Sequence, residues 1–310
     1  MAQPLRSGVL VVSKDPGITS FQVVALLRRV LQVPKVGHGG TLDPMATGVL
    51  PILINEATKL MLFMAEHTKE YVATVRLGVV TDTQDLTGRV LREAPVPALT
   101  SRAIEEVLAR FHGEIQQVPP MFSALHAGGK RLYQLARRGV EVKREPRPVM
   151  IHALTLESVE LPVFTLRVVC GKGTYVRTLC ADIGEAIGCG AALARLVRTR
   201  VGPYWLDAAV PWAELAQARD GAALWRRLLP SDSCLAHLAA IQLSEAAVAA
   251  VLNGRSVPAP ASAPSTGGLV RLYAPGGVFL GLGRLNPAPG TLKPERILHG
   301  DHPRSRVLPA

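Results

Sequence analysis

The sequence predicts an α+β fold, because strand and helix patterns follow one another without the regular alternation of a doubly wound sheet. Helical periodicity begins after Thr19, which can form a capping box with Gln22, and begins again after the cap residue Thr100. A third helix is predicted from Tyr175 to Ile187, with Gly188 as its stop. Apolar or alternating runs predict strands at residues 8–13, 50–55, 71–78 and 163–173.

A late change of composition predicts a second domain. Residues 253–268 are rich in Pro, Ala, Ser and Gly, which predicts a loop, and a helix is predicted near residues 244–253. Two short strands follow, separated by Ala-Pro-Gly-Gly, which is typical of a hairpin. Because a chain of 310 residues can bury two cores, we expect a large domain at 1–235 and a small β-rich domain at 236–310.

The chain is basic, with 35 Lys and Arg residues against 24 Asp and Glu residues and a formal net charge of +11. This charge favours a polyanionic partner, nucleic acid first, although a generally basic soluble protein has the same composition. The four cysteines form no Cys-x-x-Cys pair and no histidines pair at metal-ligand spacing, so we expect no metal site. The sequence shows neither a signal peptide nor a membrane-spanning run, which predicts a cytoplasmic protein.

A glycine-rich segment at residues 36–48, VGHGGTLDPMATG, contains a single carboxylate, Asp43. His38 lies shortly before it and Pro44 directly after it. Glycines on both sides would let the backbone approach a ligand closely. Two interpretations are open, because Asp is a common turn residue and an isolated carboxylate can also serve as a nucleophile or base.

Four further blocks carry candidate functional residues, and each also has an ordinary structural interpretation. Residues 13–20 predict a strand-to-helix connection, and residues 69–88 begin with an aromatic-led strand. Residues 126–139, HAGGKRLYQLARRG, predict a thumb-like basic helix that can bind phosphates or simply face solvent. Residues 171–190 place an arginine at a helix start, against the helix dipole. The residues of interest in these blocks are Lys14, Tyr71, Lys130, Arg131, Lys172, Tyr175 and Arg177.

Together these blocks resemble the TruB family of pseudouridine synthases, which act on uridine 55 of tRNA. The resemblance covers most of residues 8–200, and the tail resembles a PUA-type RNA-binding domain. It implies a pseudouridine synthase fold with a large mixed, mainly antiparallel sheet flanked by helices, plus a small PUA-like domain. Two loops depart from the family pattern: Pro16 lies one place later after Lys14, and Gly39 stands where the family often has Thr.

The resemblance also implies the chemistry. A uridine in the T-loop of tRNA is flipped out and isomerised to pseudouridine without a metal or organic cofactor. Asp43 corresponds to the catalytic aspartate, Arg177 to an arginine that pairs with it, and Tyr71 to a tyrosine that stacks on the base. Sequence does not choose whether Asp43 attacks the sugar, attacks the base or assists deprotonation. The resemblance also implies that Leu196 lies in the base pocket and that His38 occupies the space that the bases leave. Our own candidates for phosphate contacts are Lys14, Lys130, Arg131 and Lys172, and Tyr175 is a further candidate RNA contact.

The expected partner is the T-arm stem–loop of tRNA, and we expect a monomer with no obligate protein partner and no membrane contact. A guide-RNA-dependent synthase of the dyskerin type shares these blocks, but the sequence has no long lysine-rich tail. A non-catalytic RNA chaperone is a second alternative, although it would not need Asp43 or Arg177. An NTP-binding enzyme is disfavoured, because the glycine-rich segment contains no Gly-Lys-Ser/Thr sequence.

Overall fold

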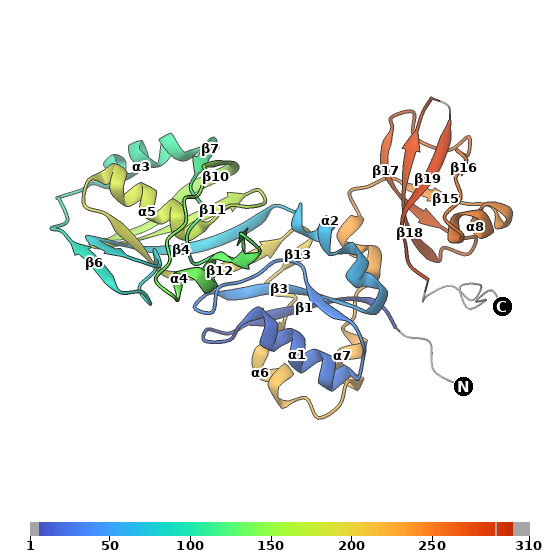
Figure 1. The fold of residues 1–310 in the computed structure, drawn as a ribbon, viewed down its shortest axis with the longest axis horizontal. Helices are drawn as coiled ribbons and strands as arrows, with labels where there is room; N and C mark the ends of the chain where they lie inside the picture. Colours follow the sequence, from blue (N-terminus) through green and yellow to red (C-terminus); the bar gives the residue numbers. More distant parts are fainter. Residues whose placement is uncertain (1–5, 289, 300–310) are drawn as a thin grey trace.

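The computed structural model describes residues 6–288 and 290–299, and it consists of a larger α+β domain followed by a smaller β-rich domain (Figure 1). One sheet of the larger domain contains the strands β1 (Gly8–Lys14), β2 (Val36–His38), β3 (Thr47–Ile54), β4 (Lys69–Leu77), β7 (Gly113–Gln117), β10 (Arg147–Glu160), β11 (Val163–Cys170), β12 (Ala191–Val201), β13 (Tyr204–Trp205) and β14 (Val210–Pro211). Their order is β14-β1-β3-β12-β4-β11-β10-β7, with β2 beside β3 and β13 beside β12. The β1–β14 and β3–β12 pairs are parallel and the other described pairs of this sheet are antiparallel, as expected.

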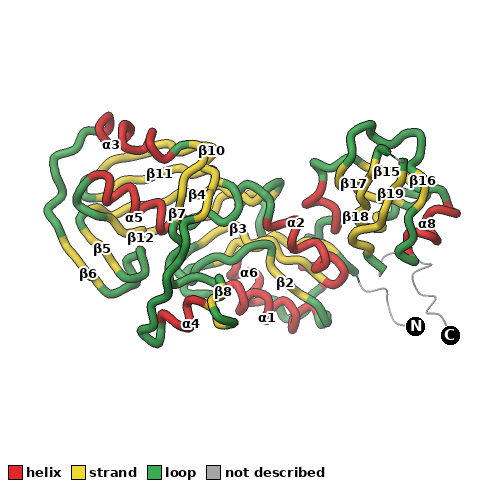
Figure 2. The backbone as a smooth tube through the Cα atoms, turned by 45° about the horizontal axis from the view of Figure 1, so that its top comes forward, coloured by secondary structure: helices red, strands yellow, loops and turns green. Residues whose placement is uncertain are grey.

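Helices and two small sheets complete the larger domain. Its helices are α1 (Ser20–Leu31), α2 (Met61–Ala65), α3 (Ser101–Leu108), α4 (Leu132–Ala136), α5 (Val176–Ile187), α6 (Trp212–Gln217) and α7 (Ala222–Arg226), with the 3-10 helices η1 (Asn55–Leu60), η2 (Ala109–Phe111) and η3 (Ser231–Leu235). The small sheets pair β5 (Val79–Thr81) with β6 (Val90–Glu93), and β8 (His126–Ala127) with β9 (Lys130–Arg131). Figure 2 shows β8 and α4 on a loop that extends away from the large sheet between β7 and β10.

Local capping explains where three helices begin or end. Thr19 accepts a hydrogen bond from the backbone of Gln22, and the Gln22 side chain accepts one from Thr19, so the expected capping box is confirmed. Thr100 caps α3, also as expected. Helix α5 begins at Val176, one residue later than expected, and ends at Ile187, where Gly188 with a φ of 100° is the expected stop.

The main core lies on one face of the large sheet, where apolar residues of the central strands pack against α1, α3 and α5. Figure 1 shows α3 and α5 at one end of the sheet and α1, α6 and α7 at the other, with β3, β12 and β4 between them. The strands that carry the candidate residues therefore run between two groups of helices.

The smaller domain is a five-stranded sheet with one α-helix and its own core. Its elements are β15 (Ala240–Gln242), α8 (Glu245–Leu252), β16 (Val257–Pro258), β17 (Gly268–Tyr273), β18 (Phe279–Asn286) and β19 (Thr291–Ile297), and the strand order is β15-β17-β18-β19-β16. The predicted hairpin is β17–β18, and the predicted helix is α8, capped by Ser244. Leu282 and Leu298 pack in one cluster with Leu235 of the larger domain, so the two domains share buried apolar surface.

Candidate active site

Asp43 lies in the loop between β2 and β3, and its carboxylate faces the guanidinium group of Arg177. The Nε atom of Arg177 is 2.7 Å from Oδ2 of Asp43. Ser20, at the start of α1, fixes the residue before Asp43. Its hydroxyl donates a hydrogen bond to the Leu42 carbonyl at 3.2 Å and accepts one from the Leu42 N–H at 2.9 Å. The Asp43 side chain is 34% exposed, so the paired carboxylate stays accessible to a substrate.

Arg177 is fixed by the protein on several sides. Its side chain is 4% exposed, Nη1 donates to the Thr83 carbonyl at 2.7 Å, and Nη2 donates to the Phe122 carbonyl at 2.9 Å. Oδ2 of Asp85 lies 3.8 Å from Nη1. These acceptors and the Asp43 carboxylate explain how a buried guanidinium is tolerated in the first turn of α5, where the helix dipole opposes a cation. Arg177 can therefore hold the Asp43 carboxylate in one orientation.

Tyr71 on β4 and Leu196 on β12 lie on the same face of the large sheet and belong to its main core. The Tyr71 residue is 8% exposed and Leu196 is 5% exposed. Burial raises the pKa of the Tyr71 hydroxyl, and the Asp43 carboxylate acts in the same direction. Tyr71 is thus a neutral phenol at pH 7, and it can offer an aromatic face and a proton close to Asp43.

Lys14 supports the Asp43 loop from inside the protein. It ends β1 with no exposed surface, and its Nζ donates to the carbonyls of Asp15 at 2.9 Å, Ile18 at 2.8 Å and Pro44 at 3.2 Å. Burial lowers the pKa of Lys14 to about 8, against the opposing effect of the Asp43 carboxylate. This position does not fit the expected phosphate contact, because all three N–H groups are used by backbone carbonyls.

Arg198 was not among the residues predicted from the sequence. It lies on β12, two residues after Leu196, and is 1% exposed. Its nitrogens donate to the carbonyls of Val49, Thr41 and Gly40. A signal was present, because alternate residues of a strand share a face. A strand predicted over residues 191–201 would have placed Arg198 beside the pocket residue Leu196.

Two glycines near Asp43 serve packing within the protein. A β-carbon added at Gly39 would lie 2.1 Å from the side chain of Met64, and one added at Gly48 would lie 2.2 Å from the backbone oxygen of Arg198. Gly48 also has a φ of 100°. These contacts correct the expectation that both glycines make room for a ligand.

The sequence also matches known families along most of its length. Residues 28–176 match the TruB family pseudouridylate synthase (N terminal domain), residues 177–236 the tRNA pseudouridylate synthase B C-terminal domain, and residues 239–298 the C-terminal domain of pseudouridine synthase II TruB. The chain is 46% identical over 295 residues to the tRNA pseudouridine synthase B of Aromatoleum aromaticum, covering 94% of this chain and 92% of that protein. The protein of the same name from Azoarcus sp. is 45% identical and is matched over 94% of each chain. This chain belongs to the TruB family of pseudouridylate synthases.

Solved structures bear out the pseudouridine synthase fold. An H/ACA RNP bound to a substrate RNA containing 2′-deoxyuridine contains a chain that matches with a TM-score of 0.71 and 25% identity, over 94% of this chain and 84% of that one. A chain of the archaeal box H/ACA sRNP Nop10–Cbf5 complex matches with a TM-score of 0.70 and 27% identity, over 97% and 88% of the two chains.

The remaining candidate RNA contacts differ in how far they are exposed and in what they contact. Lys130 and Arg131 are exposed on the β8–β9 hairpin, and Lys172 is exposed but paired with Glu66 at 2.7 Å. Tyr175 is half-buried directly before α5, where burial raises the pKa of its hydroxyl.

His38 is half-buried on β2, and its Nδ1 atom has no hydrogen-bond partner among the described residues. Burial lowers the pKa of His38, and the nearby charge of Arg198 lowers it further. A neutral imidazole is therefore expected at pH 7.

Within residues 6–288 and 290–299, no group of three or more His, Cys, Asp or Glu side chains is arranged to hold a metal ion. No helix in the same ranges is long and apolar enough to cross a membrane.

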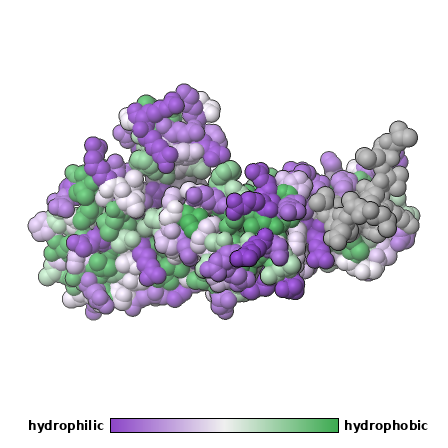
Figure 3. Space-filling view, turned by 90° about the horizontal axis from the view of Figure 1, so that it is seen from below, coloured by the Kyte–Doolittle hydropathy of each residue, from purple (hydrophilic) through white to green (hydrophobic). Residues whose placement is uncertain are grey.

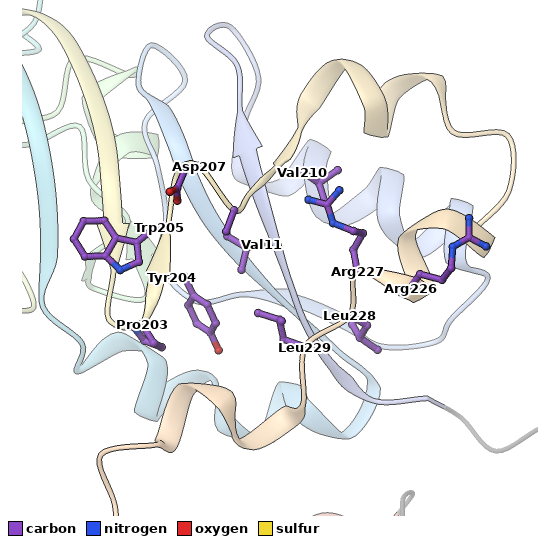
Figure 4. Close-up of a pocket in the computed structure, with 11 residues that line it drawn as sticks. Val11, Pro203, Tyr204, Trp205, Asp207, Val210, Arg226, Arg227, Leu228 and Leu229 are labelled. Carbon is purple, nitrogen blue, oxygen red and sulfur yellow. The ribbon is translucent and has the colours of Figure 1, made fainter.

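A cavity of about 550 Å³ lies between β1, β13 and residues 226–229 (Figure 4). Val11, Tyr204 and Trp205 line it, and none of the expected site residues does. The candidate site is therefore the surroundings of Asp43 and not this cavity.

Proposed function

We propose that this chain isomerises uridine 55 in the T-loop of tRNA to pseudouridine. The observation that carries the proposal is the pairing of Asp43 with Arg177 at 2.7 Å in a chain of the TruB family, with Asp43 left partly exposed. Tyr71 and Leu196 lie on the adjacent strands and supply aromatic and apolar surface for a base. Relatives that share more than 40% of their residues with this chain are named tRNA pseudouridine synthase B, which supports tRNA as the substrate.

The reaction needs one bond to break and one to form. The bond between N1 of uracil and C1′ of ribose breaks, the base turns, and C5 joins C1′. The proton leaves C5 and a proton arrives at N1, so the step is an isomerisation with no net change in oxidation state. A carboxylate at Asp43 can attack the sugar or the base or assist the proton transfer, and Arg177 keeps it oriented.

The target uridine must leave its stack to reach Asp43. Unstacking costs a few kcal/mol, which contacts with Tyr71 and Leu196 offset. His38, whose half-buried ring is neutral, is proposed to fill the space that the base vacates. Lys130, Arg131 and Lys172 remain proposed phosphate contacts, together with Tyr175, and Lys14 is reassigned to supporting the Asp43 loop.

We further propose that the T-arm stem–loop suffices as substrate and that the protein works as a cytoplasmic monomer. We also propose domain limits of 1–235 and 236–310, the second domain being a PUA-like RNA-binding module.

The net charge of +11 supports an RNA partner, and Figure 3 shows hydrophilic residues spread across one face of the molecule rather than confined to one patch. The described cysteines are all free, which suits a reducing compartment.

A guide-RNA-dependent synthase remains the alternative, because solved complexes of Cbf5 with Nop10 and Gar1 have related folds. The test is to incubate the purified chain with a T-arm hairpin transcript and to map pseudouridine in the product. We expect one modified position, the one equivalent to uridine 55, and no product on a control hairpin with cytidine there. Absence of product on the bare hairpin would refute the proposal, and recovery of product with accessory proteins and a guide would establish the alternative.

A further inference from the structure

Arg198 combines deep burial with an unusual set of partners. It is 1% exposed, and its Nε donates to the Val49 carbonyl at 2.7 Å. Its Nη1 donates to the Thr41 carbonyl at 3.2 Å, and its Nη2 donates to the Gly40 carbonyl at 3.0 Å. Within the described residues no carboxylate lies within 4.0 Å of this guanidinium, so every partner found for it is neutral.

The three carbonyls belong to the two ends of the loop that carries Asp43. Gly40 and Thr41 precede Asp43, and Val49 follows it at the start of β3. A guanidinium is planar and presents its N–H groups in fixed directions, so three simultaneous bonds fix both ends of the loop relative to β12. The backbone of Arg198 also contacts this loop, because only a residue without a β-carbon fits at Gly48 against the Arg198 carbonyl.

The same residue faces Tyr71. Arg198 and Tyr71 are directly opposite each other in the antiparallel pair of β12 and β4, so their side chains leave the same face of the sheet. The Arg198 charge lowers the pKa of the Tyr71 hydroxyl against the effect of burial. One guanidinium therefore contacts the Asp43 loop and lies beside the Tyr71 ring.

A buried cation without a carboxylate partner is unfavourable for folding, because its desolvation is not offset by an ion pair. Arg177 in the same site differs, since Asp43 and Asp85 both lie near it. A residue kept against this penalty is expected to serve the site rather than stability.

We propose that Arg198 is a positioning residue that sets the placement of Asp43 relative to Tyr71 around the flipped uridine. The inference rests on the proposed function, and it assigns to Arg198 no contact with the substrate. It predicts that the loss of Arg198 slows the chemical step much more than it weakens RNA binding.

The test compares Arg198→Met and Arg198→Lys with the control Arg195→Met, which changes an exposed arginine on the same strand. Single-turnover rates and dissociation constants are measured on the T-arm hairpin, and folding is checked by circular dichroism. We expect Arg198→Met to lower the rate by about 10²-fold, the loss typical of a small misplacement of reacting groups, with the dissociation constant changed less than about threefold. Arg198→Lys keeps the charge and part of the bonding, so its rate should lie between those of Arg198→Met and wild type.

Rates within about twofold of wild type in folded variants would overturn the proposal. Equal losses of rate and affinity, or failure of both variants to fold, would also overturn it, because Arg198 would then act through the fold alone. Wild-type protein is assayed beside the variants. Absence of product from wild type would refute the proposed function itself, whereas active wild type with unaffected variants would refute only the role of Arg198.

Discussion

Replacement of Arg177 by methionine is expected to affect stability and catalysis together. The substitution keeps a long side chain but removes the cation that pairs with Asp43 at 2.7 Å and lies 3.8 Å from Asp85. It also leaves the carbonyls of Thr83 and Phe122 without their N–H donors. All four groups lose a partner that is 4% exposed and thus shielded from water.

The expected stability loss can be bounded from these contacts. Removal of one partner from a buried ion pair costs about 3–5 kcal/mol. Two features favour the lower limit. Asp43 is 34% exposed and can be hydrated, and Asp85 still accepts hydrogen bonds from Thr83 at 2.8 Å and from the Thr87 backbone at 3.0 Å. We therefore expect Arg177→Met to lower the free energy of unfolding by about 3 kcal/mol, and Arg177→Lys, which keeps the charge, by about 1–2 kcal/mol.

The assay is urea unfolding at pH 7, with the single-turnover rate measured on the same preparations. The denaturant slope should not change, because the fold is the same, and the rate of Arg177→Met should fall at least about 10²-fold. Arg92→Met is the matched control, because Arg92 pairs with Glu185 of the same helix at an exposed site and should cost less than about 1 kcal/mol. If Arg177→Met also lowered the free energy of unfolding by less than about 1 kcal/mol, the account of a buried ion pair would be refuted.

Three further predictions concern base stacking, pH and salt. Tyr71→Phe should keep RNA affinity within about threefold of wild type, because the ring remains, and should slow turnover by at least about tenfold, because the hydroxyl is lost. An unchanged single-turnover rate would mean that Tyr71 serves only in packing. Burial raises the pKa of Asp182 from 3.8 to about 6, with Glu185 adding to the shift, so the folded state binds the Asp182 proton more tightly than the unfolded state does. This stabilising proton is lost as pH rises through 6. Asp182→Asn should therefore raise the free energy of unfolding by about 1 kcal/mol at pH 7.5, a value reduced for the partial exposure of the carboxyl group, and should leave it unchanged below pH 3.8. The control Asp207→Asn, at an exposed position, should leave the free energy of unfolding unchanged at both pH values. The logarithm of affinity for the T-arm hairpin should fall linearly and steeply with the logarithm of salt concentration, and a flat response would disconnect the +11 charge from RNA binding.

The features that could be predicted from the sequence were local ones, such as helix caps, and those implied by sequence motifs. The capping box of Thr19 with Gln22 and the stop at Gly188 are signals that act within one helical turn. The start of α1 and the end of α5 could therefore be placed from the sequence. The pairing of Asp43 with Arg177 came only from the family resemblance, because the contact joins a loop to a helix across the domain. No local pattern encodes such a contact, which depends on how β3, β12 and α5 pack.

Lys14 and Arg198 show where sequence reasoning failed. A lysine at the end of a strand is usually exposed, and nothing nearby in the sequence indicates that three backbone carbonyls surround Lys14. Arg198 lies in a strand that the sequence analysis did not assign, so its inward direction was not recognised. Both residues donate hydrogen bonds to backbone carbonyls of the Asp43 loop or of neighbouring residues. Every residue has a backbone carbonyl, so such partners cannot be recognised from the amino-acid types in the sequence.

The most direct test of the central claim is the single-turnover reaction of Asp43→Asn with the T-arm hairpin. The substitution keeps the size of the side chain and removes the charge that faces Arg177. We predict no detectable pseudouridine and a dissociation constant within about threefold of wild type, because the carboxylate acts in the chemistry and not in RNA binding. Pseudouridine formed at the wild-type rate by Asp43→Asn would contradict the account.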